Sequence, residues 1–189
     1  MEYMNEREKM ESGLLYNGID KELLNMRIKS KELCFDFNNL RPSDLEGQKK
    51  IIKKLFGSTK EEFFITAPFL CDYGFNIHVG ENFYTNHNCV ILDCAKVSFG
   101  DNVFVAPNCC FTTAGHPIDV KQRNEGLEYA YPITIGNNVW IGAGVTVLPG
   151  VTIGDNTVIG AGSVVNKDIP SGVIAVGNPC RVIKKINEK

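Results

Sequence analysis

The strongest constraint on the fold is a six-residue repeat in the C-terminal half of the chain. An aliphatic side chain recurs at every sixth position, and a small or β-branched residue follows four positions later. Neither a helix, with its period of about 3.6, nor an alternating strand, with its period of about 2, gives this spacing. A parallel β-helix does, because each face of its prism is a short strand and each corner a tight turn. The leading residues are Ile135, Ile141, Val147, Ile153, Ile159 and Val165.

The residues between these positions are those that corners require. Gly-Asx-Asn triplets recur at 100–102, 136–138 and 154–156, and glycine, asparagine and aspartate favour tight turns. A β-sandwich would instead need strands every ~8–12 residues. We therefore predict a mainly β protein, a left-handed parallel β-helix of hexapeptide repeats.

The repeat extends upstream with two interruptions. Units open at 79–80, 99–100 and 105–106, whereas 91–98 does not divide into sixes and predicts an irregular turn. A longer break at 111–134 replaces the repeat with Thr-Ala-Gly-His-Pro and a charged stretch. A polar insertion in a regular coil must protrude from it, and such loops often carry function.

Residues 1–60 predict a small helical cap rather than further coils. Segments 6–10, 20–33 and 45–56 are rich in helix formers, with Asp20 and Ser43 as expected N-caps and Gly57 as a stop. Such a cap would cover unpaired backbone groups at an open coil end. Residues 61–189 would then form the β-helix, with the protruding loop at 111–134, a last strand at 172–176, and a basic C-terminal tail from 181 that could fold back as a helix.

Composition argues against several classes of function. A formal charge of −2 does not suit nucleic acid or an anionic membrane as the main partner. No apolar run approaches the ~20 residues of a membrane span, and residues 1–12 are charged, unlike a secretory signal. The seven cysteines form no CxxC or Cys/His pattern. We expect them to be reduced thiols in a cytoplasmic protein that needs no metal.

Several motifs resemble the maltose/galactoside O-acetyltransferase family of hexapeptide-repeat acyltransferases. They are Thr-Ala-Gly-His-Pro-Ile-Asp at 113–119, Ile-Gly-Asn-Asn-Val-Trp-Ile-Gly at 135–142, Pro-Gly-Val-Thr-Ile-Gly-Asp-Asn at 149–156 and Gly-Asn-Pro-Cys-Arg-Val-Ile at 177–183. Cys-Asp-Tyr-Gly at 71–74 and the segment beginning at Gly13 agree with it, so the resemblance covers nearly the whole chain. It implies a homotrimer with sites between neighbouring prisms, and transfer of acetyl from acetyl-CoA to a sugar hydroxyl.

His116 is the expected catalytic residue. Acetyl-CoA is already an activated thioester, so the main task is to make an alcohol nucleophilic, and a base that titrates near neutral pH does this efficiently. His116 lies between a glycine and a proline in the only long loop. Direct attack in a ternary complex would need no covalent enzyme intermediate. A backbone N–H near Gly142 and Ala143 is the expected donor to the tetrahedral oxyanion.

The resemblance also implies an acceptor pocket whose polar side chains suit the hydroxyls of a sugar. Asp93 has a second interpretation, because an aspartate at a coil corner often caps a turn, and Arg27 could equally be a solvated helix residue. Gly18 stands where the galactoside enzymes carry an acidic contact, which puts a preference for galactosides in question. The implied acceptor residues are Asn86, Tyr84, Asp72, Asp93 and Arg27.

A second implied set would bind CoA. Trp140 offers an apolar face to pantetheine or adenine, or else simply covers the coil. Cations near the last coil suit the CoA phosphates. The set comprises Trp140, Gly142, Ala143, Ala161, Asn166, Lys167, Arg181 and Lys184.

Three other functions stay open on the sequence. A γ-class carbonic anhydrase would bind zinc through three histidines, and the chain has three: His78, His87 and His116. Those enzymes, however, place two closely spaced histidines where this chain has only His116. A non-catalytic β-helix scaffold would bind no CoA. Only analogy with the family argues against a hexapeptide acyltransferase that acts on a non-sugar acceptor.

Overall fold

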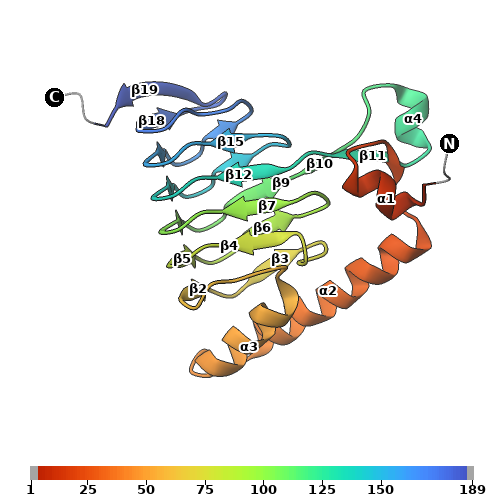
Figure 1. The fold of residues 1–189 in the computed structure, drawn as a ribbon, viewed down its shortest axis with the longest axis horizontal. Helices are drawn as coiled ribbons and strands as arrows, with labels where there is room; N and C mark the ends of the chain where they lie inside the picture. Colours follow the sequence, from red (N-terminus) through yellow and green to blue (C-terminus); the bar gives the residue numbers. More distant parts are fainter. Residues whose placement is uncertain (1–3, 187–189) are drawn as a thin grey trace.

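Short parallel strands stack into a three-sided prism with helices at one end (Figure 1). The computed structural model describes residues 4–186. We number the faces in chain order. Face 1 holds β2 (Phe63–Ile65), β5 (Phe83–Thr85), β8 (Phe104–Val105), β13 (Trp140–Ile141), β16 (Val158–Ile159) and β18 (Val173–Val176). Face 2 holds β3 (Phe69–Cys71), β6 (Cys89–Leu92), β9 (Cys110–Thr112), β14 (Thr146–Val147) and β17 (Val164–Val165). Face 3 holds β4 (Ile77–Val79), β7 (Val97–Phe99), β12 (Ile133–Ile135) and β15 (Thr152–Ile153). The predicted fold class is confirmed.

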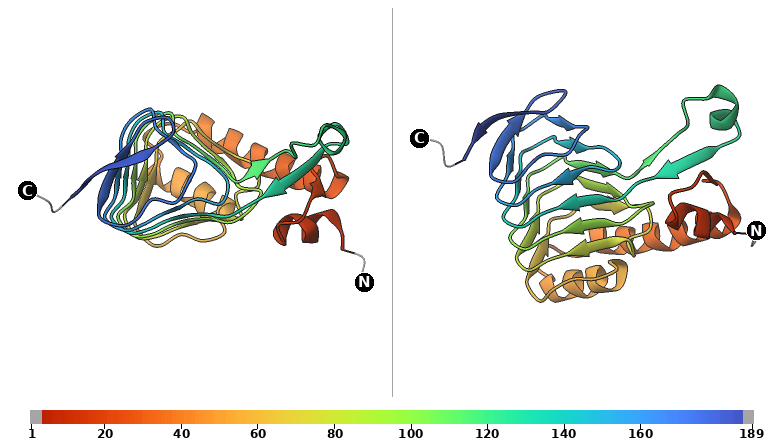
Figure 2. Two further views of the ribbon diagram at one scale, coloured as in Figure 1. Left: turned by 90° about the horizontal axis from the view of Figure 1, so that it is seen from above. Right: turned by 45° about the horizontal axis from the view of Figure 1, so that its top comes forward.

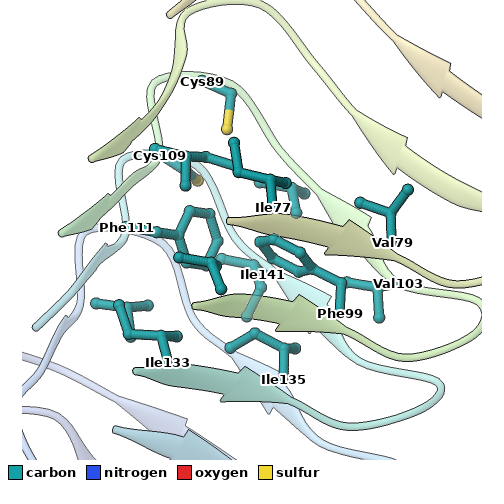
Figure 3. Packing of buried hydrophobic residues seen from close by; sticks show 14 of the residues in the cluster. Ile77, Val79, Cys89, Phe99, Val103, Cys109, Phe111, Ile133, Ile135 and Ile141 are labelled. Atoms are coloured by element: carbon teal, nitrogen blue, oxygen red, sulfur yellow. The ribbon is translucent and has the colours of Figure 1, made fainter. Parts of the chain in front are cut away.

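The leading aliphatic residues of the repeat fill the prism, and all six of them are buried. Parallel register places equivalent residues above one another, as with Ile141 beside Ile159. Larger side chains fill the earlier coils, where the ring centroids of Phe99 and Phe111 lie 5.1 Å apart (Figure 3). Removing these apolar surfaces from water is the main stabilising contribution to the fold.

One prism corner is built on asparagines in the left-handed backbone region. Asn82, Asn102, Asn138 and Asn156 all have φ between 55° and 56°. Their side-chain amides form a ladder in which each donates to the next coil, at 3.0, 3.1 and 3.0 Å. Asparagine tolerates this conformation better than other residues that carry a Cβ. The repeated Gly-Asx-Asn triplets are therefore both a turn and an inter-coil contact.

Coil length changes along the chain. Ladder partners are 20 residues apart between Asn82 and Asn102 and 18 apart between Asn138 and Asn156. The longer coils carry extra residues between faces 2 and 3, as at 93–96, which confirms the irregular turn predicted within 91–98. Between Asn102 and Asn138 the separation is 36, because the loop leaves the coil at this same corner.

Helices cover the first coil, as the sequence predicts. The covering helices are α2 (Lys21–Asn39) and α3 (Leu45–Leu55), whereas α1 (Glu6–Glu11) lies beside the protruding loop. Asp20 is confirmed as the N-cap of α2. The prediction of Ser43 as the N-cap of α3 is wrong, because the side chain of Asp44 accepts the Gly47 N–H. α2 extends past the predicted end at 33, and its last turn reaches the coil. There the Asn38 amide pairs with the Phe69 N–H and C=O, at 2.8 and 2.9 Å, and satisfies backbone groups of the first coil.

The protruding loop is itself ordered. It contains β10 (Ala114–Gly115), α4 (Val120–Asn124) and β11 (Leu127–Ala130). β11 pairs antiparallel with β10 on one side and with β1 (Tyr16–Asn17) on the other. The helical cap therefore contributes a strand that holds the loop at one corner of the prism (Figure 2).

The C-terminal tail forms a strand, so the expectation that it could fold back as a helix from Arg181 is wrong. β19 (Arg181–Lys185) pairs antiparallel with β18, which confirms the strand predicted at 172–176. The edge of β18 offers unpaired backbone groups, and the β-branched Val182 and Ile183 favour a strand there. Residues 187–189 of the predicted tail lie outside the described residues. Within 4–186, no helix has the length and apolarity needed to cross a membrane.

The corner ladder yields a test of stability. We expect Asn138→Ala to lower the free energy of unfolding by about 1–3 kcal/mol, because it loses two inter-coil hydrogen bonds and forces alanine into the left-handed region. Asn138→Gly relieves the backbone and should lose less. Urea unfolding measures both, with exposed Thr134→Ala as a control that stays within about 0.5 kcal/mol of the parent. Equal losses for alanine and glycine would contradict the backbone argument.

Candidate functional site

The predicted catalytic and acceptor residues, together with Trp140, lie at two separate places on the prism. Arg27, Asp72, Asp93 and His116 lie at the corner between faces 2 and 3, where the loop leaves. Tyr84 and Trp140 lie on face 1, and Asn86 follows β5 at the corner between faces 1 and 2. All of face 2 separates the two groups within one chain. A single copy therefore does not bring the predicted site together.

His116 is held by the protruding loop with one ring nitrogen engaged. The side chain is exposed and follows β10 directly. Nδ1 lies 3.0 Å from the carbonyl oxygen of Leu127 on β11. A carbonyl only accepts, so Nδ1 carries the proton and the neutral ring presents an unprotonated Nε2. This is the state a general base needs.

A polar cluster lies at the base of the loop, and we call it the loop-base cluster. Nη1 of Arg27 donates to the Tyr73 hydroxyl at 2.7 Å, and Nη2 donates to the carbonyl of Gly18. The Tyr16 hydroxyl donates to Oε2 of Glu128 at 2.7 Å, and the Cys94 thiol lies 3.6 Å from Oδ2 of Asp72. The cluster comprises Tyr16, Arg27, Asp72, Tyr73, Cys94 and Glu128.

Arg27 is thus fixed inside this cluster rather than solvated. Burial raises the pKa of the Asp72 carboxyl above its usual range, and the charge of Arg27 opposes part of that rise. Burial likewise raises the pKa of the Cys94 thiol, which stays protonated. Sequence reasoning did not identify Tyr16, Cys94 and Glu128 as site residues. No local pattern marks them, because tertiary pairing of β1 with β11 is what assembles them.

Asp93 has the environment of a turn cap. It is fully buried, and its Oδ1 accepts the N–H groups of Asp72 and Tyr73 at 3.1 and 2.8 Å. Its Oδ2 accepts the N–H of Asn76 at 3.3 Å. Burial raises the pKa of Asp93 to about 6, although these backbone donors lower it. The second interpretation of this residue, a capped corner, therefore accounts for its contacts.

Face 1 carries an aromatic groove of about 500 Å³. Tyr84 lies between Phe64 and Phe104, with centroid distances of 6.1 and 6.4 Å. Trp140 follows Phe104 in the next coil, and 56% of its surface is exposed. The groove ends at Asn86, whose side-chain oxygen accepts the N–H of His87 at 2.7 Å. Exposed rings beside an amide suit a ligand with both apolar and hydroxyl-bearing parts.

At the corner above this groove, hydrogen bonding distinguishes between the two backbone N–H groups predicted to bind the oxyanion, those of Gly142 and Ala143. The Gly142 N–H donates to the Ile159 carbonyl at 2.8 Å, so the coil already uses it. A Cβ at Gly142 would lie 2.6 Å from the backbone nitrogen of Ala161, and only glycine permits this approach. Ala143 and Ala161 are both exposed, and no described residue accepts the Ala143 N–H.

Cations and an amide lie at the far end of the coil. Nη1 of Arg181 donates to the Cys180 carbonyl at 2.7 Å and lies 3.5 Å from Oδ1 of Asn166. Lys167 is exposed beside Asn166, and Lys184 is exposed on β19. The structure thus brings Asn166 and Arg181 into contact and leaves both lysines available to an anionic ligand.

No group of three or more metal-binding side chains occurs within residues 4–186. The histidines lie apart: His78 faces Ser58 on face 3, His87 lies at a corner beside Ala67, and His116 is on the loop.

Comparison with known proteins gives one consistent family. The family described as "Maltose acetyltransferase hexapeptide capping motif" matches residues 9–60, and "Bacterial transferase hexapeptide (six repeats)" matches 132–167. Galactoside O-acetyltransferase of Escherichia coli is 47% identical over 96% of this chain and 90% of its own.

Two solved structures share the whole fold. A maltose O-acetyltransferase from Clostridium difficile is 54% identical, with a TM-score of 0.96 over 98% of this chain and 99% of its own. A galactoside acetyltransferase in complex with coenzyme A is 46% identical, with a TM-score of 0.95 over 98% and 92%.

The burial of Asp93 yields a pH test. Its folded-state pKa of about 6 exceeds the usual value of ~3.9, so the folded protein holds the proton more tightly than the unfolded chain. The contribution to stability is therefore complete at low pH and is lost as pH rises through 6. Relative to the non-titrating Asp93→Asn, we expect wild-type stability to fall by on the order of 2 kcal/mol between pH 4 and 7. Denaturant unfolding across this range measures it, and a difference that stays constant or grows with pH would contradict it.

Proposed function

The chain belongs to the maltose/galactoside O-acetyltransferase family and is an acyltransferase that uses acetyl-CoA, and on that premise we propose that it acetylates a hydroxyl of a sugar with His116 as general base. The observation that carries the proposal is the hydrogen bond of His116 Nδ1 to the Leu127 carbonyl. It sets the tautomer and leaves Nε2 free to take a proton from an alcohol.

The reaction needs no group bound covalently to the enzyme. Nε2 of His116 removes the proton as the sugar oxygen attacks the thioester carbonyl in a ternary complex. The tetrahedral oxyanion collapses, the carbon–sulfur bond breaks, and the CoA thiolate receives the proton from the imidazolium. The free Ala143 N–H is the proposed oxyanion donor, since the coil engages that of Gly142.

Two groups of residues would hold the substrates. We assign Arg27, Asp72, Tyr84 and Asn86 to the sugar, because they combine charged, hydroxyl and amide groups with an aromatic surface. Asp93 would act indirectly, by fixing the turn that carries Asp72. For CoA we assign an apolar contact to Trp140 and phosphate contacts to the cations of the last coil. This CoA set comprises Trp140, Gly142, Ala143, Ala161, Asn166, Lys167, Arg181 and Lys184.

We propose a homotrimer whose sites are shared between neighbouring copies. His116 and the loop-base cluster lie at one corner, and the groove of Tyr84, Asn86 and Trp140 lies beyond face 2. Placing one copy's loop against the next copy's groove completes a site, and three-fold closure repeats it three times. Ile118, 95% exposed near the loop tip, offers an apolar contact for such a neighbour.

The cytoplasm is the compartment we propose. All seven cysteines are free thiols, and Cys34 and Cys71 stay unlinked although their sulfurs lie only 3.6 Å apart. A reducing compartment keeps such thiols in this form.

Removal of the proposed base provides the direct test. We expect His116→Ala to lower kcat by about 10²–10⁴-fold, because the base is lost while the binding groups stay. Thiol release from acetyl-CoA with glucosides and other hexoses measures it. His78→Ala removes a histidine on face 3 and should retain wild-type activity. Undiminished activity in His116→Ala would remove this residue from the mechanism.

Mixing inactive variants tests the shared site. We expect His116→Ala and Asn86→Ala each to be strongly impaired. The first removes the base from the loop half of every site, and the second removes the amide from the groove half. In co-expressed trimers with random subunit mixing, about a quarter of the sites combine intact halves, so that fraction of activity should return. A site within one chain predicts no recovery, and light scattering checks the trimer.

A further inference from the structure

At the corner between faces 1 and 2, buried side chains hold backbone carbonyls that point into the prism. The same arrangement recurs in three coils, although the donor is a threonine hydroxyl, a cysteine thiol and a serine hydroxyl in turn. The bonds run from Thr85 to the Asn86 carbonyl, from Cys109 to that of Gly142 and from Ser163 to that of Gly160, at 3.3, 3.2 and 2.6 Å. All three donors are at most 1% exposed. Each thereby satisfies a backbone acceptor at the edge of the core.

An inward carbonyl turns the next backbone N–H outward. A trans peptide is planar, and its C=O and N–H point in opposite directions. Four stacked residues, one per coil, occupy the position of this N–H, and they differ in what they offer. The His87 N–H is bound by the Asn86 side chain, and Pro107 has no N–H. Ala143 and Ala161 are exposed, and no described residue accepts the N–H of either one.

Ser163 is held from two sides. Its hydroxyl oxygen accepts the Gly177 N–H at 3.0 Å, and its single hydrogen is directed to the Gly160 carbonyl. Gly160 by itself would fix that carbonyl poorly, because a glycine backbone has access to more conformations than that of any other residue. The hydroxyl thus opposes rotation of the peptide that joins Gly160 to Ala161.

We propose that Ser163 is a positioning residue for CoA, which from inside the prism directs the Ala161 N–H toward an acceptor oxygen of the bound molecule. The inference rests on the proposed function, in the part that assigns Ala161 to CoA. The pantetheine arm of CoA carries amide carbonyls, and an exposed backbone N–H without a partner suits such an acceptor. Ser163 itself would not touch CoA, because it is fully buried beneath the corner.

Deletion of the hydroxyl tests this role. Ser163→Ala should raise the Kd for CoA by about 5–30-fold, because the Ala161 N–H is no longer held toward the ligand. The kcat at saturating acetyl-CoA should stay within about 3-fold of wild type, because no reacting atom is touched. Calorimetric titration with CoA gives the Kd without any acceptor. Ser163→Cys should bind CoA more tightly than Ser163→Ala, because the chain already uses a thiol for the same bond at Cys109.

Thr157→Val is the matched control for lost stability. Thr157 is also fully buried, and its hydroxyl lies 3.2 and 3.1 Å from the carbonyl oxygens of Asp155 and Pro170. It lies at the corner between faces 3 and 1, beside the asparagine ladder. The variant should unfold at a lower denaturant concentration, as Ser163→Ala does, and yet keep the wild-type Kd for CoA.

Ala161→Pro separates this inference from the proposed function. Proline removes the N–H, and Pro107 shows that this corner accommodates proline at the equivalent position. We expect Ala161→Pro to weaken CoA binding. In that background Ser163→Ala should weaken it little further, because both changes remove the same contact.

The outcomes that contradict each statement differ. Unchanged CoA binding in Ala161→Pro would refute the CoA contact in the proposed function, and the inference would fail with it. Weakened binding in Ala161→Pro but not in Ser163→Ala would overturn the inference alone. Equal losses for Ser163→Ala in both backgrounds would do the same, because the hydroxyl would then act through another contact. A raised Kd in Thr157→Val would also overturn it, because lost stability would then explain the effect.

Discussion

Coil-to-coil stacking in constant register is the interaction on which the rest of the structure depends. Each strand donates backbone hydrogen bonds to the next coil, as in Trp140 to Thr157 and Thr146 to Ser163. The same register stacks the inward aliphatic side chains into one column and aligns the corner asparagines into ladders. Backbone pairing, apolar burial and side-chain amides therefore support the same arrangement, and this agreement makes one fold strongly preferred.

A stack of this kind is regular and repetitive, and the proposed base comes from its longest interruption, the protruding loop. The loop leaves where faces 2 and 3 meet, and it stays ordered because β1 from the cap pairs with β11. The cap thus has two tasks. Asn38 covers backbone groups of the first coil, and Tyr16 and Arg27 secure the base of the loop. Accurate placement of His116 depends on residues about a hundred positions away in sequence.

The predicted site residues are divided between two corners of the prism, and in the proposed trimer this division would link assembly to catalysis. One corner holds the charged groups of the loop-base cluster and His116, the proposed base, and the groove on face 1 offers aromatic surface and an amide. Each half lacks what the other holds. In the proposed trimer, neither half would act until copies associate.

The sequence by itself determined the prism, because a six-residue period with glycine and asparagine corners is compatible with little else. It also identified most of the cap and the protruding loop, and it indicated His116 as the candidate base, since periodicity and local motifs carry that information. Only tertiary structure decided the remainder. The tail became β19 because the edge of β18 was open, and Asp44 replaced Ser43 as a cap through its own side-chain geometry. The Gly142 N–H donates to a neighbouring coil, and the pairing of β1 with β11 places Tyr16 opposite Glu128. These contacts join residues distant in sequence, and no local pattern encodes such distances.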